Sequence, residues 1–266
     1  MSRTFAIRAA AALLLALTPL LAARAESGAL QPELVARVVA VIDGDTVALA
    51  DGREVRLVGI QAPKLPLGRR GFVAWPLADV AKAALSDLTL GHQLGLAFGG
   101  QKVDRHRRLL AHLYDEEDLW IQGALLERGL ARVYSFYDNT ALVSEMLARE
   151  RAAREAGRGI WADPYYALRD PWTVGDDSGS FQLVEGRVVA AEAAGRRFYL
   201  NFGADWSEDF TVALDRDALR RCAAAGLDPT TLAGRLIRVR GWVRSFNGPL
   251  IDVTHPEQIE VLDRVQ

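Results

Sequence analysis

Short runs of apolar residues separated by turn residues dominate the first part of the chain, and this pattern is typical of β-strands. Residues 34–49 are rich in Val, Ala and Ile and are interrupted at residues 43–44, and residues 54–60 form a second such run. Asp51-Gly52 between the two runs is a strong signal for a two-residue turn, so the pattern predicts a β-hairpin. Two more strands are expected around residues 92–98 and 108–114.

Three helices are expected among these strands, where apolar residues recur at helical spacing. Pro76 can begin a helix that runs to Leu88, because proline is well suited to a first helical turn. Asp118 can cap a second helix that runs to about Arg128 and ends at a glycine. The third helix is expected from about residue 140 to residue 156.

The chain beyond Phe181 is mostly β in character. One helix, expected at residues 217–225, interrupts a series of short strands, and such a series in a small unit predicts a closed barrel of the oligonucleotide/oligosaccharide-binding (OB) type. The polar stretch at residues 173–180 has the composition of a linker. The predicted strands are 186–190, 197–202, 210–214, 236–244, 250–253 and 258–262, and the predicted domains are 26–172 and 181–266.

The N-terminus has the pattern of an export signal. Arg3 and Arg8 precede an apolar run at residues 9–21, and Ala23-Arg24-Ala25 places small residues where a signal peptidase reads them. The run is too short to cross a bilayer comfortably. We therefore expect residues 1–25 to be a cleaved signal peptide, the mature protein to be periplasmic or secreted, and no membrane anchor to remain.

Composition narrows the possible chemistry. The formal charge is −2, from 32 Lys plus Arg against 34 Asp plus Glu, so the chain lacks a uniformly basic nucleic-acid coat. A single cysteine, Cys222, excludes an internal disulfide and a cysteine-based zinc cluster. The four histidines lack metal-ligand spacing.

Five motifs carry more specific information, and their order and spacing resemble the thermonuclease (staphylococcal nuclease-like) family over residues 35–161. The resemblance implies a mainly β (α+β) fold in which a five-stranded OB-type barrel carries three helices, and calcium-dependent phosphodiester hydrolysis of DNA or RNA. The motifs are Val41-Ile-Asp43-Gly-Asp45-Thr46, Val55-Arg56 through Gln61-Ala62-Pro63-Lys64, Asp104-Arg-His-Arg-Arg108, Gly129-Leu-Ala-Arg-Val and Gly159-Ile-Trp161.

The resemblance also implies roles for individual residues. Asp45 matches the first calcium carboxylate, and Ala62 can offer the backbone carbonyl that the calcium site needs. Arg56 and Arg108 match two arginines that hold the phosphate during catalysis. Tyr137 matches an aromatic residue at the edge of the nucleotide pocket. Asp43 matches an outer-shell acid of the calcium site, and Thr46 matches the hydroxyl beside it.

Two positions depart from the family pattern. Gln61 stands where the second calcium carboxylate belongs, and Lys64 stands where the general base belongs. A glutamine oxygen brings no charge to a calcium ion, which is held mainly by carboxylates. A protonated lysine cannot take a proton from water. The sequence therefore predicts a calcium site that is weak or lost.

Three hypotheses remain open for this site. In the first, Arg56, Arg108 and Lys64 converge on a phosphate that is bound but not cut. In the second, the Lys64 ammonium replaces the calcium charge in a metal-independent cleavage, or a lowered pKa makes Lys64 the base. In the third, another acid such as Glu54 supplies the missing base. The expected partner is nucleic acid or a nucleotide phosphate, and the oligomeric state stays open.

One strand of the second domain suggests a nucleic-acid surface. Alternation along residues 237–244 places Arg238, Arg240, Trp242 and Arg244 on one face, and cations interleaved with an aromatic ring suit single-stranded nucleic acid. The alternative is a solvated outer face on which Trp242 shields the linker. The net negative charge of this domain argues against strong nonspecific binding. A further alternative is an envelope scaffold whose second barrel binds protein or saccharide.

Overall fold

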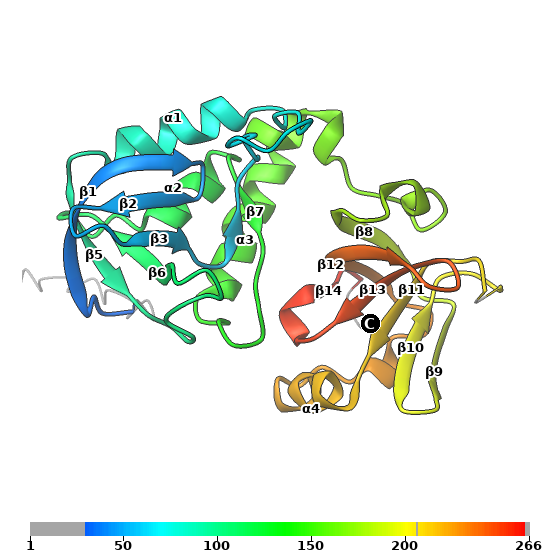
Figure 1. Ribbon diagram of the computed structural model, residues 1–266. Helices are drawn as coiled ribbons and strands as arrows, with labels where there is room; N and C mark the ends of the chain where they lie inside the picture. Colours follow the sequence, from blue (N-terminus) through cyan, green and yellow to red (C-terminus); the bar gives the residue numbers. More distant parts are fainter. Residues whose placement is uncertain (1–29, 206, 264–266) are drawn as a thin grey trace, which may run out of the picture.

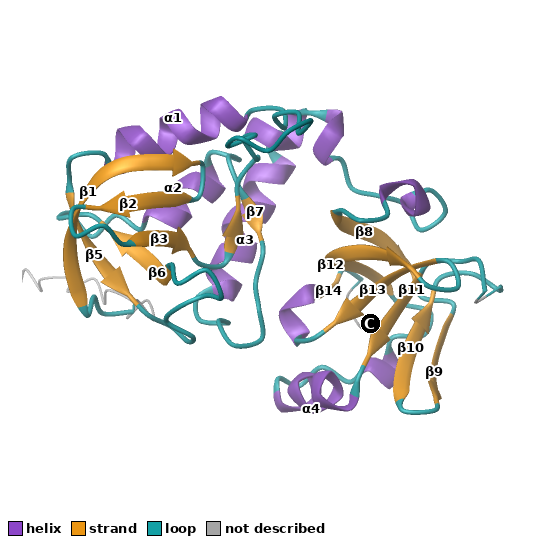
Figure 2. Cartoon of the chain, in the orientation of Figure 1, coloured by secondary structure: helices purple, strands orange, loops and turns teal. Residues whose placement is uncertain are grey.

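The computed structural model describes residues 30–205 and 207–263, which form two β-rich units (Figure 1). The predicted export signal at residues 1–25 lies outside the described residues. No helix among the described residues is both long and apolar enough to cross a membrane. The prediction of a mainly β protein with interspersed helices is confirmed (Figure 2).

The first unit is a closed five-stranded barrel with the strand order β1-β2-β3-β6-β5, as the family resemblance implied. The β2–β3 hairpin pairs Thr46 with Arg56, and β3 runs parallel to β6. Helix α1 packs on β1, α2 on β6 and α3 on α2. The elements of this unit are β1 (Leu34–Asp43), β2 (Thr46–Leu49), β3 (Glu54–Leu57), β4 (Ile60–Gln61), α1 (Ala78–Thr89), β5 (Gln93–Ala97), β6 (Leu109–Tyr114), α2 (Ile121–Glu127), β7 (Arg132–Val133), α3 (Val143–Glu155), η1 (Gly159–Ala162) and η2 (Pro164–Tyr166).

The start of α2 differs from the expectation, whereas its end agrees. Asp118 has a positive φ of 62° and does not cap the helix, which begins at Ile121. Asp115 organises the preceding turn instead, because its Oδ1 accepts hydrogen bonds from the Glu117 and Leu119 amides. Gly129 ends the helix with φ 66°, and a Cβ there would lie 2.1 Å from a backbone oxygen of Arg158.

The second unit is a seven-stranded sheet with one α-helix. Its pairing follows the open path β14-β12-β13-β11-β10-β9, with β8 also on β12, so no closed ring of pairs forms among its described residues. Asp215 caps α4 by accepting a hydrogen bond from the Ala218 amide. The elements are η3 (Val174–Asp177), β8 (Phe181–Arg187), β9 (Ala190–Ala194), β10 (Arg197–Asn201), β11 (Thr211–Leu214), α4 (Arg216–Ala224), η4 (Pro229–Thr231), β12 (Leu236–Ser245), β13 (Pro249–Val253), η5 (Pro256–Gln258) and β14 (Ile259–Val261).

Two features of this unit depart from the expected pattern. Residues 186–190, expected as a strand, span the end of β8 and the start of β9. The stretch expected as a linker is folded, because η3 buries Val174 in the second core and Arg169 pairs with Asp177 at 2.7 Å. The connection between the units is therefore part of the second unit's packing.

Buried ion pairs join the two units. Arg240 of β12 is almost completely buried, and its guanidinium lies 3.0 Å from each carboxylate oxygen of Glu150 on α3. The same guanidinium lies 2.5 Å from Glu260 of β14, and Arg154 lies 3.0 Å from Glu150. Arg238 also contacts Glu260 and pairs with Glu185, so three arginines meet three glutamates here, and the exposed Arg151 reaches Glu260 at the edge. Opposite charges therefore offset one another, which is what a buried ionic cluster requires.

Candidate phosphate site of the first unit

The turn between β1 and β2 places two carboxylates side by side. The Asp45 amide donates a hydrogen bond to Asp43 Oδ1 at 3.1 Å, which fixes the turn. A Cβ at residue 44 would lie 2.7 Å from the Ala62 side chain and 2.8 Å from the Ala81 side chain, so only glycine fits there. Both carboxylates are buried at the end of the barrel that faces the loop after β4.

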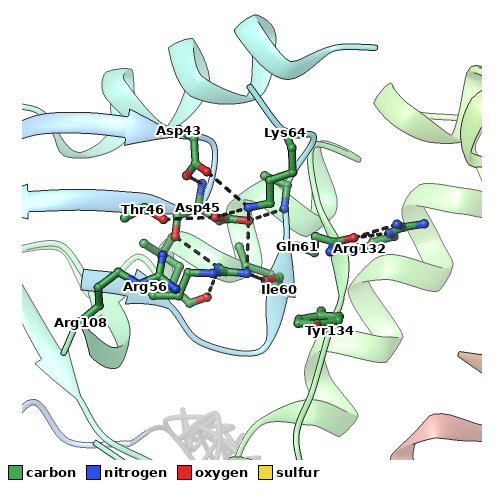
Figure 3. A network of polar contacts seen from close by, with 12 residues as sticks. Asp43, Asp45, Thr46, Arg56, Ile60, Gln61, Lys64, Arg108, Arg132 and Tyr134 are labelled. Carbon is green, nitrogen blue, oxygen red and sulfur yellow. Dashed lines mark hydrogen bonds and ion pairs between the residues drawn. The ribbon is translucent and has the colours of Figure 1, made fainter. Parts of the chain in front are cut away.

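Asp45 is fully buried and its carboxylate is surrounded by donors (Figure 3). Lys64 Nζ lies 2.6 Å from Oδ2 and 2.7 Å from Oδ1, and the Ala62 amide donates to Oδ2 at 2.7 Å. Arg56 Nη2 lies 3.3 Å from Oδ2, and the Thr46 hydroxyl donates to Oδ1 at 3.3 Å. Burial alone would raise the pKa of Asp45, but Arg56 and Lys64 outweigh it and lower that pKa to about 2.

Asp43 has weaker contacts with positive charge than Asp45. Lys64 Nζ is 3.4 Å from Asp43 Oδ2, compared with 2.6 Å from Asp45. Burial and the neighbouring Asp45 charge raise the pKa of Asp43, while Lys64 opposes them. The four charged groups Asp43, Asp45, Arg56 and Lys64 sum to zero, so this cluster is neutral without any added ion.

The two arginines expected to hold phosphate have different surroundings. Arg56 directs Nη1 to the Leu57 carbonyl at 2.7 Å and Nη2 to the Ile60 carbonyl at 2.6 Å, so its guanidinium fixes the backbone of the β3–β4 turn. Arg108 pairs with Asp104 at 2.7 Å and remains about a quarter exposed. Arg108 is therefore the more available of the two for an external anion.

Both arginines line a pocket of about 560 Å³ on the surface of the first unit. Arg105 and His106 add basic groups from the loop before β6, and Tyr134 and Phe136 add aromatic rings from the segment after β7. Phe136 is half exposed. Cations beside aromatic rings suit a nucleotide, which combines a phosphate with a flat base.

Comparison with known proteins places the first unit in a family. Residues 54–163 match the family described as staphylococcal nuclease homologue. An uncharacterized endonuclease of Escherichia coli O157:H7 is 32% identical over 130 residues, which is 48% of this chain and 76% of the relative. A protein of the same name from Escherichia coli has the same identity and coverage. The chain belongs to the staphylococcal nuclease homologue family.

The residues present do not fit the calcium ion that the staphylococcal nuclease-like resemblance implies. Both oxygens of Asp45 already contact Lys64, and Gln61 Oε1 accepts two hydrogen bonds from Arg132, at 2.7 and 3.0 Å. Gln61 thus faces β7 and points away from Asp45 (Figure 3). No group of three or more His, Cys, Asp or Glu side chains suited to a metal occurs among residues 30–205 and 207–263.

Lys64 has a different environment from the one expected for it. The hypothesis brought its ammonium together with Arg56 and Arg108 on a phosphate, but the ammonium contacts the carboxylates of Asp43 and Asp45 and does not line the pocket. Glu54, the substitute base considered above, is exposed at the start of β3 opposite Ala48 and lies outside the polar network around Asp45.

Tyr137 was expected at the edge of the nucleotide pocket, but it is not among the residues that line the pocket of Arg56 and Arg108. Its ring is covered by the Arg221 guanidinium of α4, 4.3 Å from the ring centroid. Tyr134 and Phe136 take the pocket side of this segment instead. Sequence reasoning missed Tyr134 and Phe136. In an extended segment, residues 134 and 136 face the side opposite to residues 135 and 137, and this alternation was the available signal.

The predicted nucleic-acid stripe is wrong for two of its three arginines, Arg238 and Arg240. Arg238 and Arg240 are buried and ion-paired, with Glu185 and Glu260 for the first and with Glu150 and Glu260 for the second. Arg240 faces α3 of the first unit, and Arg238 is engaged by carboxylates of β8 and β14, so neither guanidinium is offered to nucleic acid. Trp242 is half exposed and donates a hydrogen bond to Tyr134, and Arg244 pairs with Asp252.

Proposed function

We propose that the protein binds nucleic acid through a nucleotide phosphate held at the Arg108 side of the first unit's pocket, and that this binding does not use calcium. The ion pair between Lys64 and Asp45 carries this proposal, because it neutralises the carboxylate that a calcium ion would need. The family membership and the E. coli relatives named as endonucleases support nucleic acid as the ligand class.

The pocket chemistry supports the phosphate. Arg108 presents a partly exposed guanidinium, and guanidinium groups bind phosphate oxygens in a two-point geometry. Arg105 and His106 lie on the same side, and Phe136 offers a ring on which a base can stack. Asp104 and Asp138 also line the pocket, which limits its positive charge and favours a terminal nucleotide over a long duplex.

Cleavage without metal is the second candidate function. The Lys64 ammonium is fixed by Asp43 and Asp45, and a fixed cation beside Arg56 can stabilise a developing negative charge. Such an activity would persist in the presence of a chelator, whereas the family's calcium chemistry would not.

The decisive experiment measures binding and cleavage on the same full-length protein. End-labelled DNA and RNA are incubated with calcium, with magnesium or with chelator, and binding is followed by fluorescence anisotropy. We expect binding that a chelator leaves unchanged and no calcium-stimulated cleavage. Calcium-stimulated cleavage would refute the proposal, and equal cleavage under all conditions would establish the second candidate. Arg108→Ala is the binding-deficient variant, and the exposed Arg220→Ala is its matched control.

We also propose export of the mature protein beginning after residue 25, on the sequence pattern alone. N-terminal sequencing of the protein recovered from cell fractions tests this. A mature N-terminus at residue 26 in the periplasm or medium supports export, and an intact N-terminus in the cytoplasm refutes it.

A further inference from the structure

One wall of the phosphate pocket is formed by residues 134–139, called here the pocket wall. Four of its residues line the pocket, namely Tyr134, Phe136, Asp138 and Asn139. The pocket wall follows β7 and belongs to no strand of its own, with a single isolated bridge between Phe136 and Asn139. A backbone hydrogen bond from the Tyr134 amide to the Gly59 carbonyl, at 2.8 Å, fixes its start, and side-chain contacts hold much of the rest.

The second unit contacts the pocket wall at three neighbouring residues. Trp242 of β12 donates from Nε1 to the Tyr134 hydroxyl at 2.9 Å. Ser135 Oγ lies 2.7 Å from His255 Nε2. The Arg221 guanidinium of α4 covers the Tyr137 ring. These contacts come from separate elements of the second unit and converge on one short segment.

The Ser135 contact is held in a defined direction by a chain of hydrogen bonds. Gln258 Nε2 donates to the Arg240 carbonyl, which leaves Gln258 Oε1 to accept from the Thr254 hydroxyl. Thr254 Oγ1 must then accept from His255 Nδ1–H at 2.9 Å, and His255 Nε2 is left to accept from the Ser135 hydroxyl.

His255 remains neutral in this arrangement. Burial and the nearby Arg221 and Arg240 charges together lower the pKa of His255 to about 4. The imidazole therefore keeps one acceptor nitrogen at neutral pH. Both of its ring nitrogens have partners, so the ring orientation is fixed.

The interunit ion pairs extend to the start of the pocket wall. Glu150 accepts hydrogen bonds from Arg240 and also from the Val133 amide at 2.5 Å. Val133 directly precedes Tyr134. The far end of the wall is held by the first unit, because the Asn139 side chain donates to the Gln101 carbonyl and the Gln101 amide donates to the Asp138 carbonyl. The second unit thus holds the middle of a segment whose ends are already tied.

From these contacts we infer that the second unit is a positioning part of the nucleotide pocket, in which Trp242 and His255 hold the pocket wall in the shape that receives the ligand. This inference rests on the proposed function for the ligand class. A wall that is ordered in advance does not lose conformational entropy on binding, so the free protein is prepared for the nucleotide. Trp242 and His255 act through Tyr134 and Ser135 and do not touch the ligand themselves.

The test uses the full-length double variant Ser135→Ala/Trp242→Phe, which removes two hydrogen bonds and keeps most of the packing. We expect the Kd for adenosine 3′,5′-bisphosphate to rise on the order of two- to tenfold for each hydrogen bond lost. Amide hydrogen exchange should accelerate at residues 134–139 more than elsewhere. Arg151→Ala is the matched control, because exposed Arg151 contacts Glu260 across the same interface without touching the pocket wall.

The outcomes separate this inference from the proposed function. If the unmodified protein fails to bind the bisphosphate, the proposed function is wrong, and hydrogen exchange still decides whether the second unit orders the wall. Unchanged affinity and unchanged exchange in the double variant would overturn the inference. If the double variant does not fold, the single variant Ser135→Ala, which loses only one hydroxyl, gives the same two readouts.

Discussion

Lys64 Nζ lies within 2.7 Å of both carboxylate oxygens of Asp45, so the ammonium of Lys64 neutralises the negative charge of Asp45. Lys64 comes from the loop after β4, and Asp45 comes from the turn before β2. A lysine and a metal ion compete for the same oxygens. The affinity of this site for cations is therefore set by residue 64 more than by the acids around it.

Replacing Lys64 should change calcium binding according to the charge introduced. Lys64→Glu adds a third carboxylate beside Asp43 and Asp45, and we expect its calcium affinity to exceed that of the unmodified protein by about tenfold or more. Lys64→Met removes the ammonium without adding an acid and serves as the control. Gln61→Asp should gain less, because Arg132 already occupies the side-chain oxygen at that position. Titration calorimetry measures all three, and micromolar calcium binding by the unmodified protein would contradict this account.

Arg56 and Arg108 should differ in what their loss affects. Arg56→Ala removes one donor each from the Leu57 carbonyl, the Ile60 carbonyl and the buried Asp45 carboxylate, and we expect a loss of about 2–3 kcal/mol in the free energy of unfolding. Arg108→Ala should leave that free energy nearly unchanged and weaken bisphosphate binding by about tenfold or more. Urea unfolding and anisotropy titration separate the two effects. Equal stability losses in both variants would show that Arg108 is also structural.

The buried Arg240 should be needed for the assembly of the two units. Arg240→Met removes one positive partner from each of the buried carboxylates of Glu150 and Glu260. Because an uncompensated buried charge is costly, we expect a loss of about 3–5 kcal/mol in the free energy of unfolding. Arg220→Ala removes an exposed pair with Asp217 and should cost less than about 0.5 kcal/mol. Urea unfolding tests both. A small loss for Arg240→Met would mean that the interface packs well without its ions.

Two buried histidines should make the protein sensitive to acid. Burial lowers the pKa of His112 from 6.5 to about 4, and burial together with the Arg221 and Arg240 charges does the same for His255. The unfolded chain therefore binds protons that the folded chain does not, and the free energy of unfolding falls as the pH drops from 6.5 towards 4. Above pH 6.5 neither residue contributes a pH dependence. The slope of the free energy of unfolding against pH gives the number of protons taken up on unfolding, and His255→Asn should lower that number by up to one. An unchanged slope would show that His255 protonates in the folded protein.

Much of the first unit follows from local sequence features. The β2–β3 hairpin, the interruption of the first strand at Asp43-Gly44 and the ends of α2 and α3 were predicted, because turn geometry and helix ends depend on the residues at those positions. The predicted start of α2 was wrong. Neither Asp115 nor Asp118 caps the helix, whose N-cap is Trp120, and Asp115 accepts hydrogen bonds within the preceding turn instead.

The contacts of the site depended on residues far apart in the sequence. Gln61 and Arg132 are paired through β4 and β7, and nothing in either local sequence indicates the partner. Alternation in β12 correctly placed Arg238 and Arg240 on one face, but it could not say that Glu150 and Glu260 cover that face. Sequence determined the barrel, its turns and which side chains share a face. The tertiary structure decided which faces are buried and which charges meet, because a strand's periodicity is local whereas the surface that packs against it comes from another part of the chain.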